Sequence, residues 1–469
     1  MRTVWKSATV AAVFAGFGIS IAAAQAANSA ATAIDGRWDA NLISHGSSIP
    51  FRLDISGSGP TLKGTFYDGF DPYDGTTSAT FENGKLVLNI EHYLTTITAT
   101  LQDGKLVGNV ATRSRGGNGA YDFEATRHID TPEAAGNAPN IAGSWTIPLA
   151  SPSAKGEKAF RFIVKQRGAE VAASILRVDG DTGSYSGAYK DGKWALSHFD
   201  GGRPGQIEVS LNNDGTLQII QGGPRPPAAA QENSNGSSAQ TASAGANNPY
   251  NEAATPTSGR YARTLTAYRE DVAKAKGLPQ PDDYDTHTTA RDPNEKFVFN
   301  FPDVDGKLVS QDDPRFKGKV VLAIVTGTWC PNCHDEAQYL VQLDKKNRDK
   351  GLAIVALDFE EPEQQGSLER ERAFVKKYGV EYTYLIAGAP SDMWEKVPQL
   401  VNLNTWPATI FIGRDGKVKA VHSGFASPAS GEFHSDLEKQ FTARIEKLLA
   451  EEPSQSVADA TNPPSKHGE

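Results

Sequence analysis

The sequence predicts a multidomain protein in which two tandem antiparallel β-barrel or sandwich repeats precede one α/β domain. The chain has 469 residues, which is too long for a single hydrophobic core. Hairpin signals recur at a nearly constant spacing up to residue 270, and alternating strand and helix patterns follow residue 292. The predicted segments are 1–26 (signal peptide), 33–128 (first β-repeat), 140–270 (second β-repeat), 271–291 (linker), 292–450 (α/β domain) and 451–469 (disordered tail).

The first 26 residues have the pattern of a secretory signal peptide. Arg2 and Lys6 precede an almost wholly apolar run from Ala8 to Ala24, and Ala24-Gln25-Ala26 is a small-x-small cleavage site. We therefore expect an exported, soluble protein; the alternative is an uncleaved membrane anchor. The net charge of −9 argues against a nucleic-acid binder, and no cluster of Lys and Arg compensates for it.

The β-repeats are predicted from segments that recur about 108 residues apart. Ile34-Asp35-Gly36-Arg37-Trp38 returns as Ile141-Ala142-Gly143-Ser144-Trp145, at an offset of 107. The turn Asn83-Gly84-Lys85 returns as Asp191-Gly192-Lys193, at an offset of 108. Such Asn-Gly and Asp-Gly turns between alternating runs are strong hairpin signals. Self-similarity of this kind predicts two copies of one β-structure.

A low-complexity segment interrupts the second copy. Tyr121–Thr126, the last strand of the first copy, finds its best counterpart in Tyr261–Thr266, at an offset of 140. Residues 223–259 account for the difference, and they are rich in Pro, Ala, Ser, Asn and Gln. We expect a disordered loop inside the second repeat; the alternative is an ordinary linker between domains.

The α/β domain is predicted from the order of its elements. A short strand over 297–301 precedes the continuous apolar run 320–325, which is typical of a buried central strand. Helical periodicity over 331–350 and a second apolar run over 352–357 complete a right-handed βαβ unit. Further elements are a charged amphipathic helix, a third strand, an antiparallel hairpin and a final helix, expected at 367–378, 380–386, 409–421 and 437–448.

The chain has only two cysteines, Cys330 and Cys333, and they stand three residues apart. That spacing cannot join distant parts of the fold, so it indicates redox chemistry, a metal or haem. A strand before Cys330 and a helix after it place the pair at a helix N-terminus, which stabilises a thiolate and lowers its pKa. We predict that Cys330 attacks a disulfide and that Cys333 resolves the mixed disulfide.

Residues 292–450 resemble the TlpA/ResA-like branch of the thioredoxin family, which acts outside the cytoplasm. The matching motifs are Phe-Pro-Asp-Val-Asp-Gly-Lys (301–307), Phe-Lys-Gly-Lys-Val-Val-Leu (316–322), Gly-Thr-Trp-Cys-Pro-Asn-Cys (327–333), Trp-Pro-Ala-Thr-Ile-Phe-Ile (406–412) and Asp-Gly-Lys-Val (415–418). The resemblance implies a thioredoxin fold and a protein-disulfide oxidoreductase. It also implies a periplasmic location, disulfide-bearing client proteins and a membrane electron donor of the DsbD/CcdA type. It covers about a third of the chain and says nothing about the β-repeats.

The resemblance also implies roles for residues around the cysteine pair. Pro407 is expected to be cis and to hold the Trp406 backbone open for an incoming client peptide, with Trp329 as a further substrate-binding residue. Glu336 stands three residues after Cys333, on the same helical face, so it is a candidate for proton transfer to or from that thiol. The alternative for Glu336 is a plain first-turn glutamate that the helix dipole favours.

Three alternatives remain open at this level. Cys330-Pro331-Asn332-Cys333-His334 also fits the pattern of c-type haem attachment, although the strand and the later proline favour dithiol chemistry. We interpret His334 as a solvated helix residue that helps to hold Cys330 as a thiolate. The protein could instead sense redox state or bind a ligand through its β-repeats. We favour a reductase over an oxidant or isomerase, and expect no cofactor and no metal.

Overall fold

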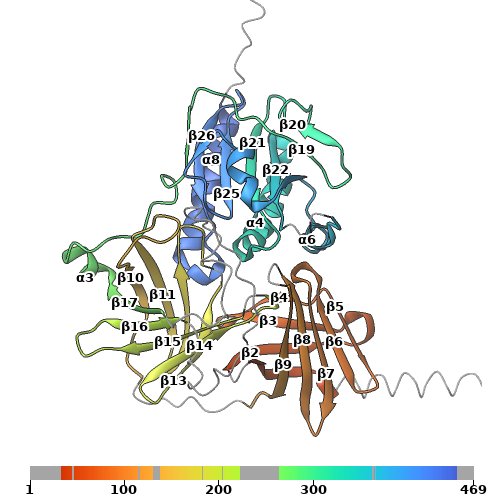
Figure 1. Ribbon diagram of the computed structural model, residues 1–469, viewed down its shortest axis with the longest axis vertical. Helices are drawn as coiled ribbons and strands as arrows, with labels where there is room; N and C mark the ends of the chain where they lie inside the picture. Colours follow the sequence, from red (N-terminus) through yellow and green to blue (C-terminus); the bar gives the residue numbers. More distant parts are fainter. Residues whose placement is uncertain are drawn as a thin grey trace, which may run out of the picture.

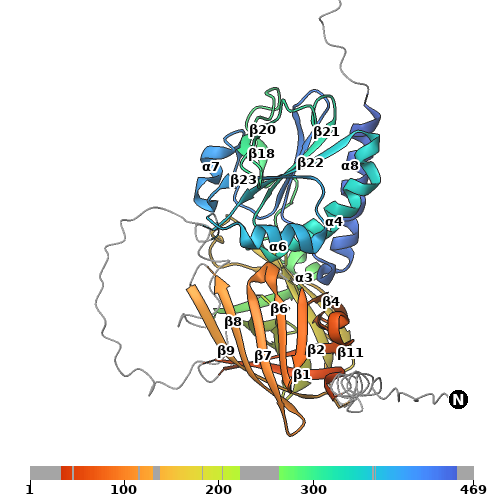
Figure 2. The same ribbon diagram turned by 90° about the vertical axis from the view of Figure 1, so that its right-hand side faces the viewer.

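The chain folds into an open β-sheet, a closed β-barrel and an α/β domain that lies across one end of both (Figure 1, Figure 2). The structure is a computed structural model and describes residues 33–44, 47–114, 117–129, 138–181, 183–202, 204–221, 263–361, 364 and 366–451. The predicted signal peptide, the segment 223–259 and residues 452–469 of the predicted tail lie outside the described residues. Within the described part, no helix is long and apolar enough to cross a membrane.

Alternating side chains build the first body, a nine-stranded antiparallel sheet. Leu86, Leu88 and Ile90 are fully buried on one face of a single strand, as a period of two requires. In spatial order the strands are β4 (Asp71–Gly75), β3 (Lys63–Asp68), β2 (Ser47–Ser56), β1 (Gly36–Ser44), β9 (Gly117–Arg127), β8 (Lys105–Ser114), β7 (Thr95–Gln102), β6 (Lys85–Ile90) and β5 (Ser78–Glu82). Two short 3₁₀ turns, η1 (Gly59–Thr61) and η2 (Glu91–Tyr93), complete this body.

This first body is not the closed barrel or sandwich that the repeat pattern predicts. Its end strands β4 and β5 do not pair with each other, so the sheet stays open. β4 instead extends toward the α/β domain, where Tyr73 reaches Asp335 and Lys377 binds Asp74 at 2.6 Å. Phe199 of the second body packs into the core of the open sheet, with its ring 4.8 Å from that of Phe51. Phe199 of the second body therefore covers apolar core residues of the open sheet that closure into a barrel would otherwise bury.

The second body is a closed antiparallel barrel of eight strands. Neighbouring strands along the chain pair with each other, and β17 closes the ring by pairing with both β16 and β10. The strands are β10 (Gly143–Pro148), β11 (Ala159–Arg167), β12 (Glu170–Leu176), β13 (Tyr185–Lys190), β14 (Lys193–His198), β15 (Gly205–Leu211), β16 (Leu217–Gln221) and β17 (Arg263–Arg269).

The first strands of the two bodies carry the same local structure. The Trp38 indole donates to the Ile34 carbonyl at 2.8 Å, and the Trp145 indole donates to the Ile141 carbonyl at 2.9 Å. An arginine from the last strand lies over each indole, at 4.3 Å in the first body and 3.9 Å in the second. Descent of the two bodies from one repeat stays a prediction.

The register of the last strands corrects one predicted match. Trp38 pairs with Arg127, and Trp145 pairs with Arg269, so the two last strands correspond at an offset of 142. The predicted match of Tyr121 with Tyr261 is therefore wrong by two residues. The strand after the low-complexity segment nevertheless belongs to the barrel, because β17 pairs with β16.

The α/β domain is built on a five-stranded mixed sheet. Its strands, in spatial order, are β23 (Thr383–Gly388), β22 (Leu352–Phe359), β21 (Val320–Thr326), β25 (Ala408–Ile412) and β26 (Val418–Ser423). β21 and β22 are parallel and wholly buried, which confirms the predicted βαβ unit. The helices are α4 (Pro331–Asn347), α6 (Glu369–Tyr378), α7 (Met393–Lys396) and α8 (Glu432–Ala450), with 3₁₀ turns η4 (Arg348–Lys350), η5 (Pro390–Asp392) and η6 (Pro428–Ser430).

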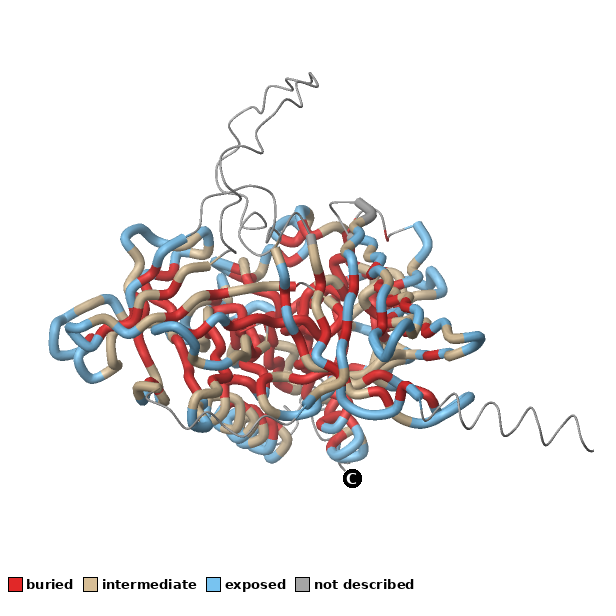
Figure 3. Tube along the Cα trace, turned by 90° about the horizontal axis from the view of Figure 1, so that it is seen from below, coloured by how far each residue is buried: buried red, intermediate tan, exposed pale blue. Residues whose placement is uncertain are grey.

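Smaller elements connect the barrel to this domain. The segment predicted as a linker overlaps helix α3 (Glu270–Ala275) and then packs against the α/β domain, where Asp285 accepts hydrogen bonds from Arg444 and contacts His422 at 2.9 Å. The short strands β18 (Thr289–Ala290) and β24 (Leu400–Val401) pair with each other, as do β19 (Asn300–Pro302) and β20 (Leu308–Ser310). Buried residues fill the interior of each body and also occur where the bodies meet (Figure 3).

Candidate active site

The two cysteines lie at the start of α4, at the end of the domain that faces the β-bodies. Cys330 is the extended residue that caps the helix, and Pro331 opens the first turn, where its missing N–H costs nothing. The Cys333 amide donates to the Cys330 carbonyl at 3.0 Å, so one tight turn joins the two thiols. Both side chains are buried: Cys330 is 3% exposed and Cys333 is 1% exposed.

Trp406 and Pro407 lie directly beside this turn. The Trp406–Pro407 peptide bond is cis, as predicted, and the Cys330 thiol donates to the Trp406 carbonyl at 3.3 Å. The Trp329 indole donates to the Phe359 carbonyl at 2.9 Å, and its ring meets that of Trp406 edge to face at 5.2 Å. Trp329, Trp406 and Pro407 therefore meet at the cysteine pair, as the sequence predicts. Their part in substrate binding stays a prediction.

Glu336 lies one turn below Cys333, fully enclosed in the domain at 1% exposure. Burial raises the pKa of Glu336 to about 8, although the Thr409 hydroxyl donates a hydrogen bond to its carboxyl group. Burial also raises the pKa of the Cys333 thiol well above its usual value, and the Cys330 sulfur and the Glu336 carboxylate raise it further. A titratable carboxyl group thus lies beside a thiol whose pKa burial raises. This position allows the predicted proton transfer, which stays a prediction.

His334 is not the solvated residue that we predicted. It is 2% exposed, because η2 of the open sheet and α6 pack against it. Burial, followed by the neighbouring His92, lowers its pKa well below the usual value, so the ring is neutral and gives Cys330 no positive charge. Nε2 lies 2.7 Å from the Thr328 carbonyl and Nδ1 lies 2.8 Å from the Tyr378 hydroxyl. Both ring nitrogens are therefore occupied within the protein, which also weighs against an axial haem ligand here.

One group of acidic side chains in the described part of the chain has the spacing of metal ligands. Carboxylate oxygens of Asp358, Glu360 and Glu371 lie within 4.8 Å of one another, all buried. Arg370 pairs with Glu360, and burial raises the pKa of Asp358 well above its usual value and that of Glu371 to about 7. Protonation and Arg370 thus offset the charge of this group without a metal ion.

Residues of the β-bodies cover the cysteine turn, and none of them was predicted from the sequence. The Asn332 amide, inside the Cys-x-x-Cys turn, donates to the backbone carbonyl of Asp179 at 2.6 Å. Tyr73 of the open sheet donates to Asp335 on the next turn of α4. Asp179 and Gly180 follow the same Asp-Gly pattern as the hairpin turns, so no sequence signal separates them from ordinary turns.

Comparison with known proteins places the α/β domain. The redoxin family matches residues 289–440. Thiol-disulfide oxidoreductase ResA of Bacillus thuringiensis (strain Al Hakam) is 32% identical over 120 residues, which cover 26% of this chain and 62% of ResA. ResA of Bacillus subtilis (strain 168) is 30% identical over 126 residues, which cover 27% of this chain and 64% of ResA. Residues 289–440 thus match the redoxin family and are similar to ResA, and we call them the redoxin domain.

The matches to these proteins cover only part of this chain. The chain spans about 62% of the length of the ResA of Bacillus thuringiensis. Among solved structures, a thiol:disulfide interchange protein of the thioredoxin family from Chlorobium tepidum TLS is 21% identical. The match covers 34% of this chain and all of that one, with a TM-score of 0.26. Each of these matches covers 34% of this chain or less.

Proposed function

We propose that the protein is an extracytoplasmic thiol–disulfide oxidoreductase that reduces disulfides of client proteins with its own dithiol. The observation that carries the proposal is the single helical turn that holds Cys330 and Cys333 beside the backbone of Trp406. The similarity to the thiol-disulfide oxidoreductase ResA supports the same activity.

In the proposed reaction the Cys330 thiolate attacks one sulfur of a client disulfide. The Cys330–client disulfide forms and a client thiolate leaves. Cys333 then loses its proton to Glu336 and attacks the Cys330 sulfur, which forms the Cys330–Cys333 disulfide and releases the second client thiolate. Two electrons pass from the dithiol to the client, whose thiolates take up two protons. A membrane dithiol donor of the DsbD/CcdA type would return two electrons to the enzyme.

Reduction of insulin disulfides tests the activity. The full-length protein, supplied with dithiothreitol, should accelerate insulin reduction, and Cys330→Ser should abolish the acceleration. Cys333→Ser should instead accumulate a covalent Cys330–client complex that is visible on a non-reducing gel. Undiminished activity in Cys330→Ser would exclude the proposed reaction, and no acceleration by the wild-type protein would leave a sensing or ligand-binding role.

The preferred direction of electron flow is a separate part of the proposal. A reduction potential near the thioredoxin value, about −270 mV, would support a reductase, whereas one near about −120 mV would make the protein an oxidant. Equilibration with glutathione buffers measures this potential in the full-length protein.

Export is the remaining part of the proposal, and the apolar run that ends at Ala26 supports it. Expression of the full chain in a Gram-negative host should yield a periplasmic protein whose N-terminus follows Ala26. A protein that stays in the cytoplasm with Arg2 and Lys6 retained would contradict it.

A further inference from the structure

The thiol that must meet a client protein is almost completely covered in this structure. Cys330 is 3% exposed, and the segment Val178–Asp181, in the connection from β12 to β13 of the barrel, lies against Asn332 of the same turn. A mixed disulfide needs access to the Cys330 sulfur, so a large client cannot react while the β-bodies lie in this position. The contacts of this segment show how the coverage is achieved.

Val178–Asp181 lies along the edge of the redoxin sheet as an additional strand would. Gly180 forms a parallel bridge with Phe425, which follows the edge strand β26, and the Phe425 amide donates to the Asp179 carbonyl at 3.4 Å. The same carbonyl accepts the hydrogen bond from Asn332. Exposed sheet edges commonly bind extended peptides through backbone hydrogen bonds of this kind. The segment therefore makes peptide-like contacts with Asn332, which lies between the two cysteines in the sequence.

Two glycines allow this close approach. A Cβ atom on Gly180 would lie 2.3 Å from the Phe425 carbonyl oxygen and 2.6 Å from Cγ of Asn332. A Cβ atom on Gly424 would lie 2.3 Å from the Val178 carbonyl oxygen. Both distances are far below van der Waals contact, so the two backbones fit together only without side chains at these positions.

A specific polar contact fixes the far end of the segment. The Asp181 carboxylate accepts hydrogen bonds from the Ser427 amide, at 3.0 Å, and from the Ser430 hydroxyl. Both donors belong to the redoxin domain, and Asp181 belongs to the barrel. The edge of the redoxin sheet thus binds Gly180 and, directly after it, the acidic side chain of Asp181.

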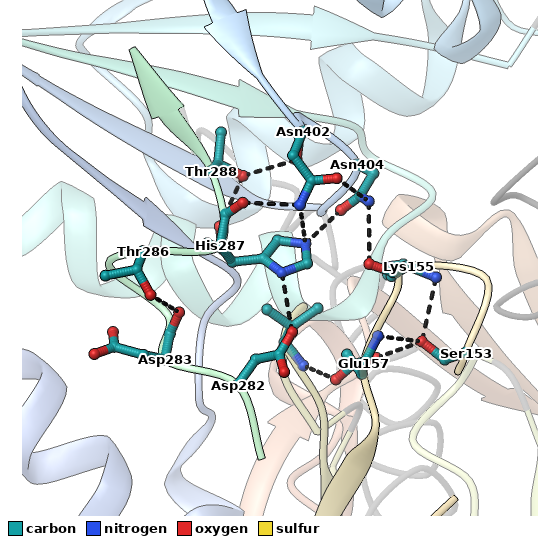
Figure 4. Close-up of polar contacts among 12 residues, drawn as sticks. Ser153, Lys155, Glu157, Asp282, Asp283, Thr286, His287, Thr288, Asn402 and Asn404 are labelled. Atoms are coloured by element: carbon teal, nitrogen blue, oxygen red, sulfur yellow. Dashed lines mark hydrogen bonds and ion pairs between the residues drawn. The ribbon is translucent and has the colours of Figure 1, made fainter. Parts of the chain in front are cut away.

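The barrel holds the segment in this position from behind. Glu157 accepts a hydrogen bond from the Val178 amide at 2.6 Å, and the Lys155 ammonium pairs with the Asp179 carboxylate. Figure 4 shows this support, in which Ser153, Lys155 and Glu157 lie opposite His287 and Asn404 of the redoxin side. Asn404 donates to the Lys155 carbonyl at 3.3 Å, so the support itself contacts the redoxin domain.

We propose that Val178–Asp181 occupies the client-binding edge of the redoxin domain as an intramolecular substitute for a client. The segment must leave this edge before a protein disulfide can reach Cys330, and a client that replaces it offers an extended chain with Gly followed by Asp or Glu. This inference rests on the proposed function for the identity of the client. The coverage of Cys330 by the segment is independent of that function.

Alkylation of Cys330 in the reduced, full-length protein tests the coverage. Gly180→Ala should raise the rate of reaction with iodoacetamide about tenfold or more, because the covered state otherwise leaves only a minor open population. Gly192→Ala is the matched control: Gly192 also has a positive φ, 86°, but lies at a barrel hairpin where an added Cβ meets nothing within 4 Å. Equal alkylation rates in the wild type and Gly180→Ala would overturn the proposal.

A second variant separates the occupant from the edge that binds it. Gly424→Ala should also speed alkylation, since its Cβ displaces Val178. It should nevertheless slow the reduction of insulin, because the client needs the same edge, whereas Gly180→Ala should accelerate that reduction. Faster insulin reduction in both variants would show that clients do not use this edge. Loss of insulin reduction in every variant, with alkylation still accelerated, would refute the proposed function and leave the coverage intact.

A peptide tests the client chemistry. Arg-Val-Asp-Gly-Asp copies residues 177–181 and should inhibit insulin reduction by Gly180→Ala, in which the edge is vacated. The same peptide with Val in place of Gly should not inhibit, because its side chain meets the Phe425 carbonyl. Equal effects of the two peptides would overturn the specificity that we infer.

Discussion

Glu336 and His334 stand two positions apart on α4, and burial shifts their pKa values in opposite directions. Burial raises the pKa of Glu336 to about 8 and lowers the pKa of His334 well below its usual value. In both cases burial disfavours the charged form, which is the acidic form of histidine and the basic form of glutamic acid. Only Glu336 therefore exchanges a proton in the pH range where thiols ionise.

Replacement of Glu336 by Gln tests its proposed part in proton transfer. Cys333 must lose a proton before it attacks the mixed disulfide, and Glu336 accepts a proton only once it is ionised. The rate of that step should therefore rise with pH through about 8 in the wild type. Glu336→Gln should lower the rate by roughly 10²-fold and remove this inflection. Stopped-flow fluorescence of single turnovers, measured from pH 6 to 10, follows the step.

Thr409→Val is the matched control for this prediction. The Thr409 hydroxyl donates to the Glu336 carboxyl group and lowers its pKa. Its loss should move the inflection to higher pH without abolishing it. An unchanged pH profile in Glu336→Gln would leave Glu336 as a structural residue only.

Helical spacing was enough to place Cys333, Glu336 and His334 on α4, but not to decide which of them faces solvent. The spacing gives each residue a direction around the helix axis. What lies in that direction depends on η2 and α6. His334 contacts His92 of η2 and Phe374 of α6, which are 242 (334 − 92) and 40 (374 − 334) residues away in the sequence. The error at His334 has this physical origin.

At the scale of elements, local patterns located the redoxin strands because each one is a continuous apolar run. β21 and β22 are buried along their whole length, so their hydrophobicity alone marks them. The alternating strands of the first body were also recognisable, but closure of a sheet depends on which strands meet at its ends. β4 contacts the redoxin domain instead of β5, and no residue within β4 encodes that choice on its own.

Because the first sheet stays open, its core includes Phe199 from the barrel. It belongs to the connection between β14 and β15 of the barrel, yet it is 2% exposed among Phe51 and Phe66 of the first body. Phe199→Ala should lower the free energy of unfolding of the first body by about 3–5 kcal/mol, since it removes a ring from a packed core. Urea unfolding followed by tryptophan fluorescence measures the change.

A conservative variant provides the comparison for Phe199. Phe199→Leu keeps most of the apolar volume and should cost less than about 1.5 kcal/mol. A similar loss for Leu and Ala would show that the aromatic shape matters more than the filled volume. Unchanged stability in Phe199→Ala would contradict the view that the barrel completes the core of the open sheet.

At the scale of the whole molecule, the sequence predicted the dithiol and its helix but not the coverage of the dithiol. The coverage is formed by residues that are about 150 and 260 positions from α4, such as Asp179 and Tyr73. Contacts between separately folded bodies depend on complementary surfaces, and a single sequence does not mark such surfaces by any periodic pattern.

The surface between the bodies contains an excess of acidic groups around a cavity of about 10 Å³. Burial raises the pKa of Asp335 well above its usual value, and the facing Asp68 raises it further. Burial also raises the pKa of Asp68. His198 offsets this increase only in part, and the Asp181 and Asp200 carboxylates raise the pKa further. The closed arrangement therefore holds protons that an open, hydrated arrangement would release.

This difference predicts that pH controls the coverage of the dithiol. At Asp68 and Asp335 the closed state binds more protons than the open state, so raising the pH above about 4, the usual pKa of aspartic acid, should favour opening through these two groups. The effect should grow until the raised pKa values of the closed state are passed. The Ser427 amide, which donates to Asp181, should accordingly exchange its hydrogen faster at pH 8 than at pH 5, after correction for intrinsic exchange.

Asp335→Asn should weaken this pH dependence, because the amide side chain does not titrate. Asp344→Asn is the control and should preserve the pH dependence, since Asp344 lies on the same helix but pairs with Arg348. If Asp335→Asn keeps the full pH dependence, the acidic groups at this surface do not govern opening.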